Sequence, residues 1–177
     1  MAPHLRLFFA LWPSDTVRLA LWDLGGRLHK TWNGRRMKPD TLHMTLAFLG
    51  DTPADRLDEL RVLAAGVQTS KFSMELDRAS CWRHNKVGFA SPEEVPQELT
   101  LLAHGLEDAL ETHGFAFDER PYKPHVTLLR NTRCTTQVPF VPVTWAVDEF
   151  VLVSSSTAEQ GASYKLLGRW PMKPASS

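Results

Sequence analysis

Two stretches of the sequence share one pattern: "LHMTLAFLG" at residues 42–50 and "PHVTLLRNT" at residues 124–132. Each contains His-x-Thr-Leu, which begins at His43 in the first stretch and at His125 in the second. Both copies follow a segment with helical spacing of apolar residues and a loop that contains a Lys-Pro pair. The repetition predicts two halves of similar build, each of which supplies one motif strand.

The alternation of residue types within each motif indicates a strand with one polar and one apolar face. Side chains two residues apart on a strand share a face and lie about 6 to 7 Å apart along it. His43 therefore points the same way as Thr45, and His125 the same way as Thr127, while the intervening apolar residues face the core. Each strand presents one imidazole and one hydroxyl together.

A site formed by both strands would hold two imidazoles and two hydroxyls around a small polar space. Displacement at phosphorus requires a base for the attacking oxygen and an acid for the leaving oxygen on the opposite side. Two histidines, with an ordinary pKa of about 6.5, can supply one neutral and one charged ring near neutral pH. Threonine hydroxyls can donate hydrogen bonds to the non-bridging phosphate oxygens. The repeated pattern favours phosphoryl chemistry, although one copy alone is most often a structural sheet histidine.

The remaining sequence predicts a mixture of strands and helices in a single domain of 177 residues. We expect strands at about residues 5–12, 71–82, 86–90, 141–155 and 164–170, and helices that begin near Ser14, Pro53 and Pro96. Residues from about 171 onward are expected to form a frayed tail. This order fits an α+β fold with mainly antiparallel sheets better than a regular βαβ alternation.

Composition and charge narrow the class of protein. The chain is 43% hydrophobic and 23% charged, and its 20 basic residues balance 20 acidic ones, so no long-range field attracts a nucleic-acid backbone. No segment is long and apolar enough to span a membrane. Cys81 and Cys134 lack CxxC spacing, and the sequence shows no secretory leader. We therefore expect two free thiols in a cytoplasmic protein.

Two other catalytic chemistries have less support in the sequence. A metal hydrolase would need HxH, HExxH or clustered cysteines, and the partner of each histidine here is a threonine rather than a carboxylate. A serine hydrolase would need a GxSxG turn, which the sequence lacks. We therefore expect neither a metal nor another cofactor.

The paired motifs "HMTL" and "HVTL" resemble the HxTx motifs of the two-histidine (2H) phosphoesterases. With "RLFFAL" near the start and "PYKPHVTLLR" at the second motif, the chain is similar to the bacterial RNA 2',3'-cyclic phosphodiesterases, historically called 2'-5' RNA ligases. The resemblance runs from Leu5 to Trp170. It implies one bilobal α+β domain over residues 1–177 with pseudo-twofold symmetry, in which helices flank the sheets and the two HxTx strands line a central cleft.

The resemblance also implies a reaction, the metal-independent opening of a 2',3'-cyclic phosphate to a 2'-phosphate. By similarity, His43 protonates the leaving 3' oxygen and His125 activates the attacking water. Thr45 and Thr127 would bind the phosphate, and Arg130, three residues after the second motif threonine, is a further phosphate-binding candidate. Strict alternation places Arg130 on the face opposite His125, so it reaches the cleft only if the strand bends or ends there.

The expected partners are RNA with 2',3'-cyclic phosphate ends, tRNA fragments among them, or cyclic nucleotides, with the chain acting as a monomer. Basic residues beside the motifs could form a local rim for RNA, although solvation of the surface explains most of them equally well. These residues are Arg35, Arg36, Lys38, Arg120, Lys123, Arg130 and Arg133. Asp40 and Asp148 are candidates to orient an imidazole.

Two alternatives to hydrolysis stay open at this point. The family's ATP-independent 2'-5' RNA ligation would use the same site, with an RNA 5' hydroxyl in place of water. A non-catalytic nucleotide-binding module would keep the pocket without the chemistry, and the presence of both histidines counts against it.

Overall fold

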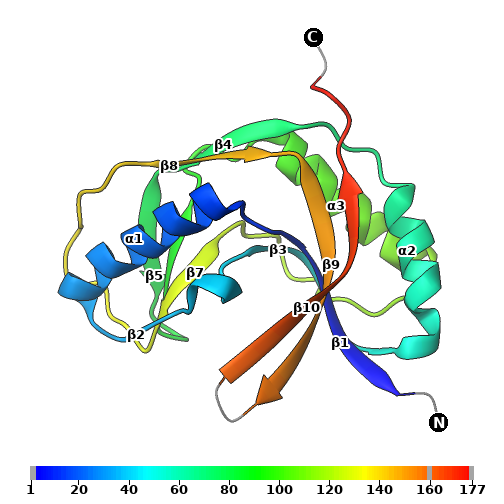
Figure 1. Cartoon of the computed structure of the whole chain (residues 1–177), viewed down its shortest axis with the longest axis horizontal. Coiled ribbons are helices and arrows are strands. Elements are labelled where there is room, and N and C mark those ends of the chain that lie inside the picture. The colour runs from blue at the N-terminus through cyan, green and yellow to red at the C-terminus, as the bar shows by residue number, and fades with distance from the viewer. Residues whose placement is uncertain (1–2, 159–160, 176–177) are drawn as a thin grey trace.

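Within residues 3–158 and 161–175, the computed structural model contains three α-helices, one large sheet and one two-stranded sheet (Figure 1). The helices are α1 (Asp15–Trp32), α2 (Leu57–Ala65) and α3 (Gln97–Thr112). The strands are β1 (His4–Leu11), β2 (Arg35–Arg36), β3 (Met44–Pro53), β4 (Phe72–Leu76), β5 (Arg78–Trp82), β6 (Val87–Ser91), β7 (Val126–Arg130), β8 (Val143–Val147), β9 (Glu149–Ala158) and β10 (Gly161–Pro171). Short 3-10 turns lie at Pro39–Thr41 and Ala54–Arg56. The predicted α+β class with antiparallel sheets is confirmed.

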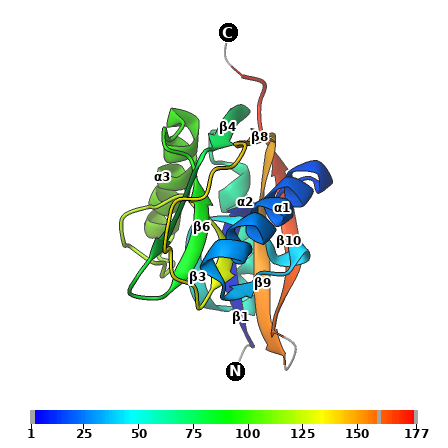
Figure 2. The same ribbon diagram turned by 90° about the vertical axis from the view of Figure 1, so that its left-hand side faces the viewer.

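The large sheet spans both halves of the sequence in the order β10-β9-β1-β3-β7-β6-β5, with β2 paired to β7. The small sheet pairs β4 with β8 and crosses the top of the molecule in Figure 1. The element order β1-α1-β3 recurs as β6-α3-β7, and each helix packs on the motif strand of the other half, α1 on β7 and α3 on β3. In Figure 2, α3 and α1 lie on either side of the central strands. Elements of both halves therefore hold β3 and β7 in place.

Strand β1 shows how the sheet separates two apolar clusters. Leu7, Phe9 and Leu11 are fully buried in the main core with the three helices, whereas Phe8 and Ala10 belong to a second, smaller cluster. The alternation of side chains along a strand puts the two sets on opposite faces. Full burial of each Leu or Phe stabilises the fold by roughly 1.5–3 kcal/mol. The smaller cluster supports the face that carries the motif histidines.

Local sequence signals mark the starts of the helices. The Ser14 side chain caps α1 by accepting a hydrogen bond of 3.3 Å from the backbone N–H of Val17, as predicted. The helix expected to begin near Pro53 does so as a 3-10 turn at Ala54–Arg56, which Pro53 precedes as the N-cap and which continues into α2 at Leu57. Pro53 is also the last residue of β3, where it pairs with His4 of β1.

Two segments expected to be single strands are each divided by an aspartate. Residues 71–82 form β4 and β5 on either side of Asp77, and residues 141–155 fall into β8 and β9 on either side of Asp148. In each case the first strand joins the small sheet and the second joins the large one. Two consecutive polar residues, Asp77-Arg78 and Asp148-Glu149, interrupt the apolar alternation at the breaks, but the pattern does not show which sheet each strand joins.

The C-terminal segment is ordered beyond the expected start of the tail at about residue 171. Met172 is buried, and its backbone N–H donates to the carbonyl of Asp148 at 2.8 Å. The carbonyl of Lys173 accepts a hydrogen bond of 2.8 Å from the N–H of Lys71. These bonds attach the C-terminal segment to Asp148, between β8 and β9, and to Lys71, just before β4.

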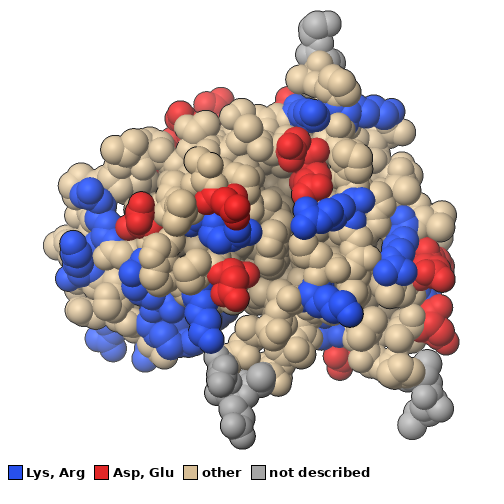
Figure 3. Space-filling model, viewed as in Figure 1, with Lys and Arg blue, Asp and Glu red and all other residues tan. Residues whose placement is uncertain are grey.

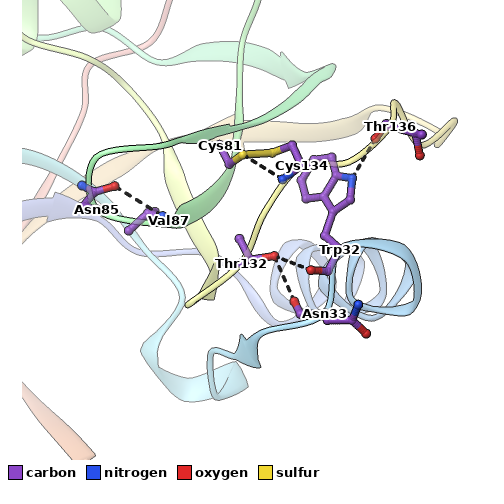
Figure 4. Close-up of a disulfide and its surroundings, with 8 residues drawn as sticks. All are labelled: Trp32, Asn33, Cys81, Asn85, Val87, Thr132, Cys134 and Thr136. Atoms are coloured by element: carbon purple, nitrogen blue, oxygen red, sulfur yellow. Dashed lines mark hydrogen bonds between the residues drawn. A yellow bond between two sulfur atoms is a disulfide. The ribbon is translucent and has the colours of Figure 1, made fainter.

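Cys81 and Cys134 form a disulfide, so the expectation of two free thiols is wrong (Figure 4). Their Cα atoms lie 6.0 Å apart across a separation of 53 residues in the sequence. The sheet order β7-β6-β5 brings the end of β5 to the loop that follows β7. The backbone N–H of Cys134 also lies 3.1 Å from Cys81 Sγ.

The loop after β7 is attached on its other side to the end of α1. The hydroxyl of Thr132 donates to the carbonyls of Trp32 and Asn33 at 3.0 and 2.9 Å, and the indole N–H of Trp32 donates to the carbonyl of Thr136 at 2.7 Å (Figure 4). The disulfide and these bonds together fix the loop that begins directly after Arg130.

Reduction of the disulfide should lower thermal stability. In the chain-entropy account, a cross-link that closes a loop of 53 residues stabilises the folded chain by about 4 kcal/mol. We expect dithiothreitol to lower the Tm of the wild-type protein and to leave the lower Tm of Cys81→Ser unchanged. Thermal unfolding with and without reductant, with thiol titration of the unfolded chain, tests this. A wild-type Tm that does not respond to reductant would contradict it.

Candidate active site

The two motif strands meet at the centre of the large sheet, where Met44 of β3 pairs with Val126 of β7. Both side chains are completely buried in the main core. The preceding histidines, His43 and His125, and the two motif threonines therefore lie on the opposite face of the sheet. The antiparallel register sets each histidine across from the threonine of the other motif. The two imidazoles and two hydroxyls come together as one group.

A backbone carbonyl orients each imidazole in the same way. Nδ1 of His43 lies 2.8 Å from the carbonyl oxygen of Thr41, and Nδ1 of His125 lies 2.7 Å from that of Lys123. A carbonyl oxygen only accepts hydrogen bonds, so both Nδ1 atoms must carry a proton. In the neutral ring this leaves the lone pair on Nε2. In both motifs, the hydrogen bond from the histidine to the carbonyl two residues earlier makes Nε2 the reactive nitrogen.

Aromatic side chains from neighbouring strands surround His43. The ring of Trp12, just after β1, stacks on the imidazole with a centroid distance of 5.6 Å. Phe8 of β1 lies 4.9 Å away, and Tyr164 of β10 meets the imidazole edge-on at 5.3 Å. These rings remove water from one side of His43.

His125 has its own aromatic neighbours, from the other half of the sheet. Trp82, at the end of β5, meets its imidazole edge-on at a centroid distance of 4.5 Å, and Phe89 of β6 lies 5.7 Å away. Trp82 directly follows Cys81, so the disulfide borders this side of the site.

Burial and positive charge lower the pKa of both imidazoles. Burial, together with the charges of His125 and Arg130, lowers the pKa of His43 to about 4, against the opposing effect of the Thr41 hydrogen bond. Burial also lowers the pKa of His125, with the Lys123 carbonyl acting against this shift and Arg130 adding to it. An anion that binds between the rings offsets these effects and favours protonation.

A β-bulge places Arg130 on the side of the histidines. Consecutive residues of β6 pair with Thr127 and Leu129, so Leu128 is an extra residue in β7. Leu128 and Leu129 are both buried in the main core. The alternation therefore resumes out of phase after the bulge, and Arg130 points back toward the imidazoles. The bulge therefore supplies the bend in β7 that Arg130 needs in order to reach the cleft.

The basic side chains are unevenly distributed despite the balanced net charge. Figure 3 shows Lys and Arg gathered over the end of the molecule where α1 and β2 lie. Arg35 of β2 pairs with Arg130 of β7, so this basic end begins beside the motif strand. A local positive region of this kind attracts phosphate without a net charge on the whole chain.

A cavity of about 450 Å³ opens beside His125 and Thr45. Its other lining residues are Leu46, Ala47, Phe48, Trp82, His84, Asn85, Glu107, Asp118, Arg120, Pro121, Tyr122 and Lys123. The hydroxyl of Tyr122 donates to the carbonyl of Thr45 at 2.9 Å, which holds the loop before the second motif against β3. A larger cavity of about 760 Å³, between α1 and residues 140–143, contains none of the motif residues.

Sequence reasoning missed part of the surroundings of the histidines. Asp40 and Asp148 were expected as orienting groups, but the carbonyls of Thr41 and Lys123 occupy that role. The contact of Trp12 with His43 depends on strand pairing between β1 and β3, which no short-range pattern encodes. Within the described part of the chain, three or more His, Cys, Asp or Glu side chains nowhere converge to hold a metal ion.

Comparison with known proteins gives consistent matches along the chain. The 2'-5' RNA ligase superfamily matches residues 17–159. The chain is 32% identical to the RNA 2',3'-cyclic phosphodiesterase of Escherichia coli strain K12 over 97% of this chain and 99% of that protein. It is 28% identical to the Thermus thermophilus protein of the same name, covering 96% and 91%. The crystal structure of E. coli LigT complexed with 3'-AMP matches with a TM-score of 0.87 at 32% identity, covering 96% and 98%.

The lowered pKa of His43 predicts a loss of stability in acid. An unfolded histidine binds a proton below about pH 6.5, whereas the folded ring has a pKa of about 4. The unfolded state therefore binds more protons between these values, and the free energy of unfolding falls as the pH drops through this window. We expect His43→Gln to reduce this fall, as measured by urea unfolding at a series of pH values. Identical pH dependence in the two proteins would contradict a buried neutral ring.

Proposed function

The chain belongs to the 2'-5' RNA ligase superfamily, and from this membership and the paired imidazoles we propose that it hydrolyses 2',3'-cyclic phosphate ends of RNA or nucleotides to 2'-phosphates. Relatives named RNA 2',3'-cyclic phosphodiesterase, 25–32% identical over most of the chain, support this reaction. The observation that carries the proposal is the pair of rings oriented alike on one face of the sheet, each with Nδ1 bound to a carbonyl.

In this reaction His125 acts as the base and His43 as the acid. His125 takes the proton of the attacking water at Nε2, and His43 gives a proton from Nε2 to the leaving 3' oxygen. Both rings have a lowered pKa, and the strongly lowered pKa of His43 makes this ring a good proton donor once it is charged. The anionic substrate supplies the negative charge that favours protonation of His43 before chemistry.

The remaining site residues bind the phosphate. The hydroxyls of Thr45 and Thr127 donate hydrogen bonds to the non-bridging oxygens, which stay negative throughout the displacement. Arg130 adds a positive charge close enough to lower the pKa of both imidazoles, and the same charge attracts the phosphate. This chemistry uses neither a metal nor another cofactor.

The expected substrates are RNA ends, tRNA fragments among them, and cyclic mononucleotides, with the chain working as a cytoplasmic monomer. Within the described residues, no helix is long and apolar enough to cross a membrane. A disulfide between Cys81 and Cys134 is unusual for a reducing compartment. Thiol trapping in intact cells would therefore show both the location and the redox state.

Ligation is the second candidate function, and the name of the matching superfamily favours it. An RNA 5' hydroxyl would replace water at His125, and the product would be a 2'-5' phosphodiester. A non-catalytic nucleotide-binding module is the third candidate, and tight binding of cyclic nucleotides without any turnover would favour it over both reactions.

Replacement of either histidine should remove most of the activity. We expect the wild type to convert adenosine 2',3'-cyclic monophosphate to the 2'-phosphate in the presence of EDTA. His43→Ala and His125→Ala should each lower the rate by about 10²- to 10⁴-fold, the usual contribution of a general acid or base. His104→Ala, on the exposed surface of α3, serves as the control. Abolition by EDTA, or full activity in either variant, would refute the mechanism.

Loss of the Arg130 charge should change both the rate and its pH dependence. We expect Arg130→Gln to lower kcat/KM by roughly 10- to 100-fold, since a charge-assisted hydrogen bond is worth about 1.5–3 kcal/mol. Arg130 lowers the pKa of both histidines, so its removal raises them and moves the alkaline limb of kcat/KM to higher pH. Arg133→Gln, exposed in the following loop, should keep the wild-type profile. A reduced rate with an unshifted profile would assign Arg130 a structural role only.

A further inference from the structure

Two segments of the chain form the basic end of the molecule, and neither contains an aspartate or a glutamate. Residues 24–39 contribute Arg27, Lys30, Arg35, Arg36 and Lys38, and residues 121–147 contribute Lys123, Arg130 and Arg133. Among the arginines of the described residues, the ones held in ion pairs are Arg18, Arg56, Arg61, Arg120 and Arg169, all of which lie outside these segments. The two segments therefore carry positive charge that no carboxylate of their own offsets.

The two segments lie side by side at one end of the fold. Arg35 of β2 is paired with Arg130 of β7. The end of α1 is attached to the loop after β7, where the indole N–H of Trp32 donates to the carbonyl of Thr136 at 2.7 Å. Their positive charges therefore add up at the end of the molecule where Figure 3 shows Lys and Arg gathered.

Strand β2 directs its two arginines to opposite faces of the sheet. Residues directly opposite each other in an antiparallel pair share a face, so Arg35 points to the same side as Arg130, the side of the histidines. Arg36 pairs with Leu129, which is buried in the main core, so Arg36 points to the α1 side. There its guanidinium lies 3.4 Å from the ring centroid of Trp22. Positive charge thus continues from the histidine face, across β2, to α1.

The opposed arginines of β2 and β7 favour an anion between them. Like charges directly opposite each other in a sheet weaken the pairing of the strands. Arg35 and Arg130 are both exposed, and neither forms an ion pair within the described residues. A phosphate bound between the two side chains offsets their repulsion, and a guanidinium can hold two phosphate oxygens at once.

A cavity of about 760 Å³ extends this positive surface beyond β2, between α1 and residues 140–143. The basic side chains in its wall are Arg27, Lys30 and Arg36, with His29 beside them. Asp23 also lines the cavity and offsets one of these charges. Trp22 and Phe140 add half-buried aromatic surface. Proteins that bind single-stranded nucleic acid combine these two features, because bases stack on aromatic rings while Lys and Arg contact the backbone.

We propose that the surface formed by Arg35, Arg27, Lys30 and the α1 cavity binds the RNA strand that carries the cyclic phosphate, beyond its terminal nucleotide. The proposal rests on the proposed hydrolytic function, because the strand starts from the phosphate held between the histidines. Backbone phosphates lie at the three basic side chains, and a base lies in the cavity. Because only a longer strand reaches α1, this surface makes an RNA end a better substrate than a cyclic mononucleotide.

The test compares a short and a long substrate with the same reacting group. Adenosine 2',3'-cyclic monophosphate and an unstructured RNA decamer that ends in a 2',3'-cyclic phosphate are hydrolysed at several salt concentrations. The wild type is compared with the double variant Arg27→Gln/Lys30→Gln, which changes two exposed residues of α1. Lys71→Gln/Arg78→Gln is the matched control, because it removes two exposed positive charges that lie outside both segments.

We expect the wild type to have a higher kcat/KM for the decamer than for the mononucleotide, with an advantage that decreases as salt rises. The α1 double variant should lose at least about fivefold in kcat/KM for the decamer at about 0.1 M salt. The slope of log kcat/KM against log salt should become shallower by about 1.4, since each phosphate contact with a single strand contributes about 0.7. The control should keep the wild-type values for both substrates.

Hydrolysis of the mononucleotide by the α1 double variant should stay within about twofold of wild type, because this substrate does not reach α1. An equal loss on both substrates would assign Arg27 and Lys30 a structural role and overturn the proposal. An equal loss of decamer hydrolysis in the control would overturn it as well, as would a wild type that hydrolyses both substrates with the same kcat/KM. Absence of hydrolysis of either substrate by the wild type would instead refute the proposed function itself.

Discussion

The buried pairing of Met44 with Val126 is the contact on which the arrangement of the site depends. It is where β3 meets β7, at the centre of a sheet that includes strands from both halves of the chain. Because the side-chain period of a strand is two, burial of these two residues forces the adjacent histidines onto the other face. A shift of one residue in either strand would turn its imidazole into the core. The helices stabilise this register by packing across the halves, α1 on β7 and α3 on β3.

Local backbone geometry makes the two motifs alike, and their surroundings make them different. Each imidazole binds the carbonyl two residues before it, so His43 and His125 present the same ring nitrogen. The aromatic rings that flank them come from different edges of the sheet, and His43 has the more strongly lowered pKa. Two imidazoles with the same local geometry thereby acquire different pKa values, as the proposed acid and base roles require.

The site also shows how a chain without net charge can present local positive charge to a phosphate. Twenty basic and twenty acidic residues cancel overall, yet Arg130 lies near both imidazoles and the basic end of the molecule begins beside its strand. Phosphate is thus attracted at short range, where burial strengthens each charge interaction. Burial lowers the pKa of the histidines, and it also strengthens their interaction with a bound anion. Binding of an anion therefore raises the pKa of a nearby imidazole and favours its protonation.

The sequence by itself determined the antiparallel α+β class, the cap of α1 at Ser14 and the shared face of each histidine and threonine, because these follow from the spacing of neighbouring residues. Tertiary structure alone decided the rest. The bulge that turns Arg130, the change of sheet at Asp77 and Asp148, and the pairing of Cys81 with Cys134 depend on which strands become neighbours and in which register. Such contacts join residues far apart in the chain, and local periodicity carries no information about them.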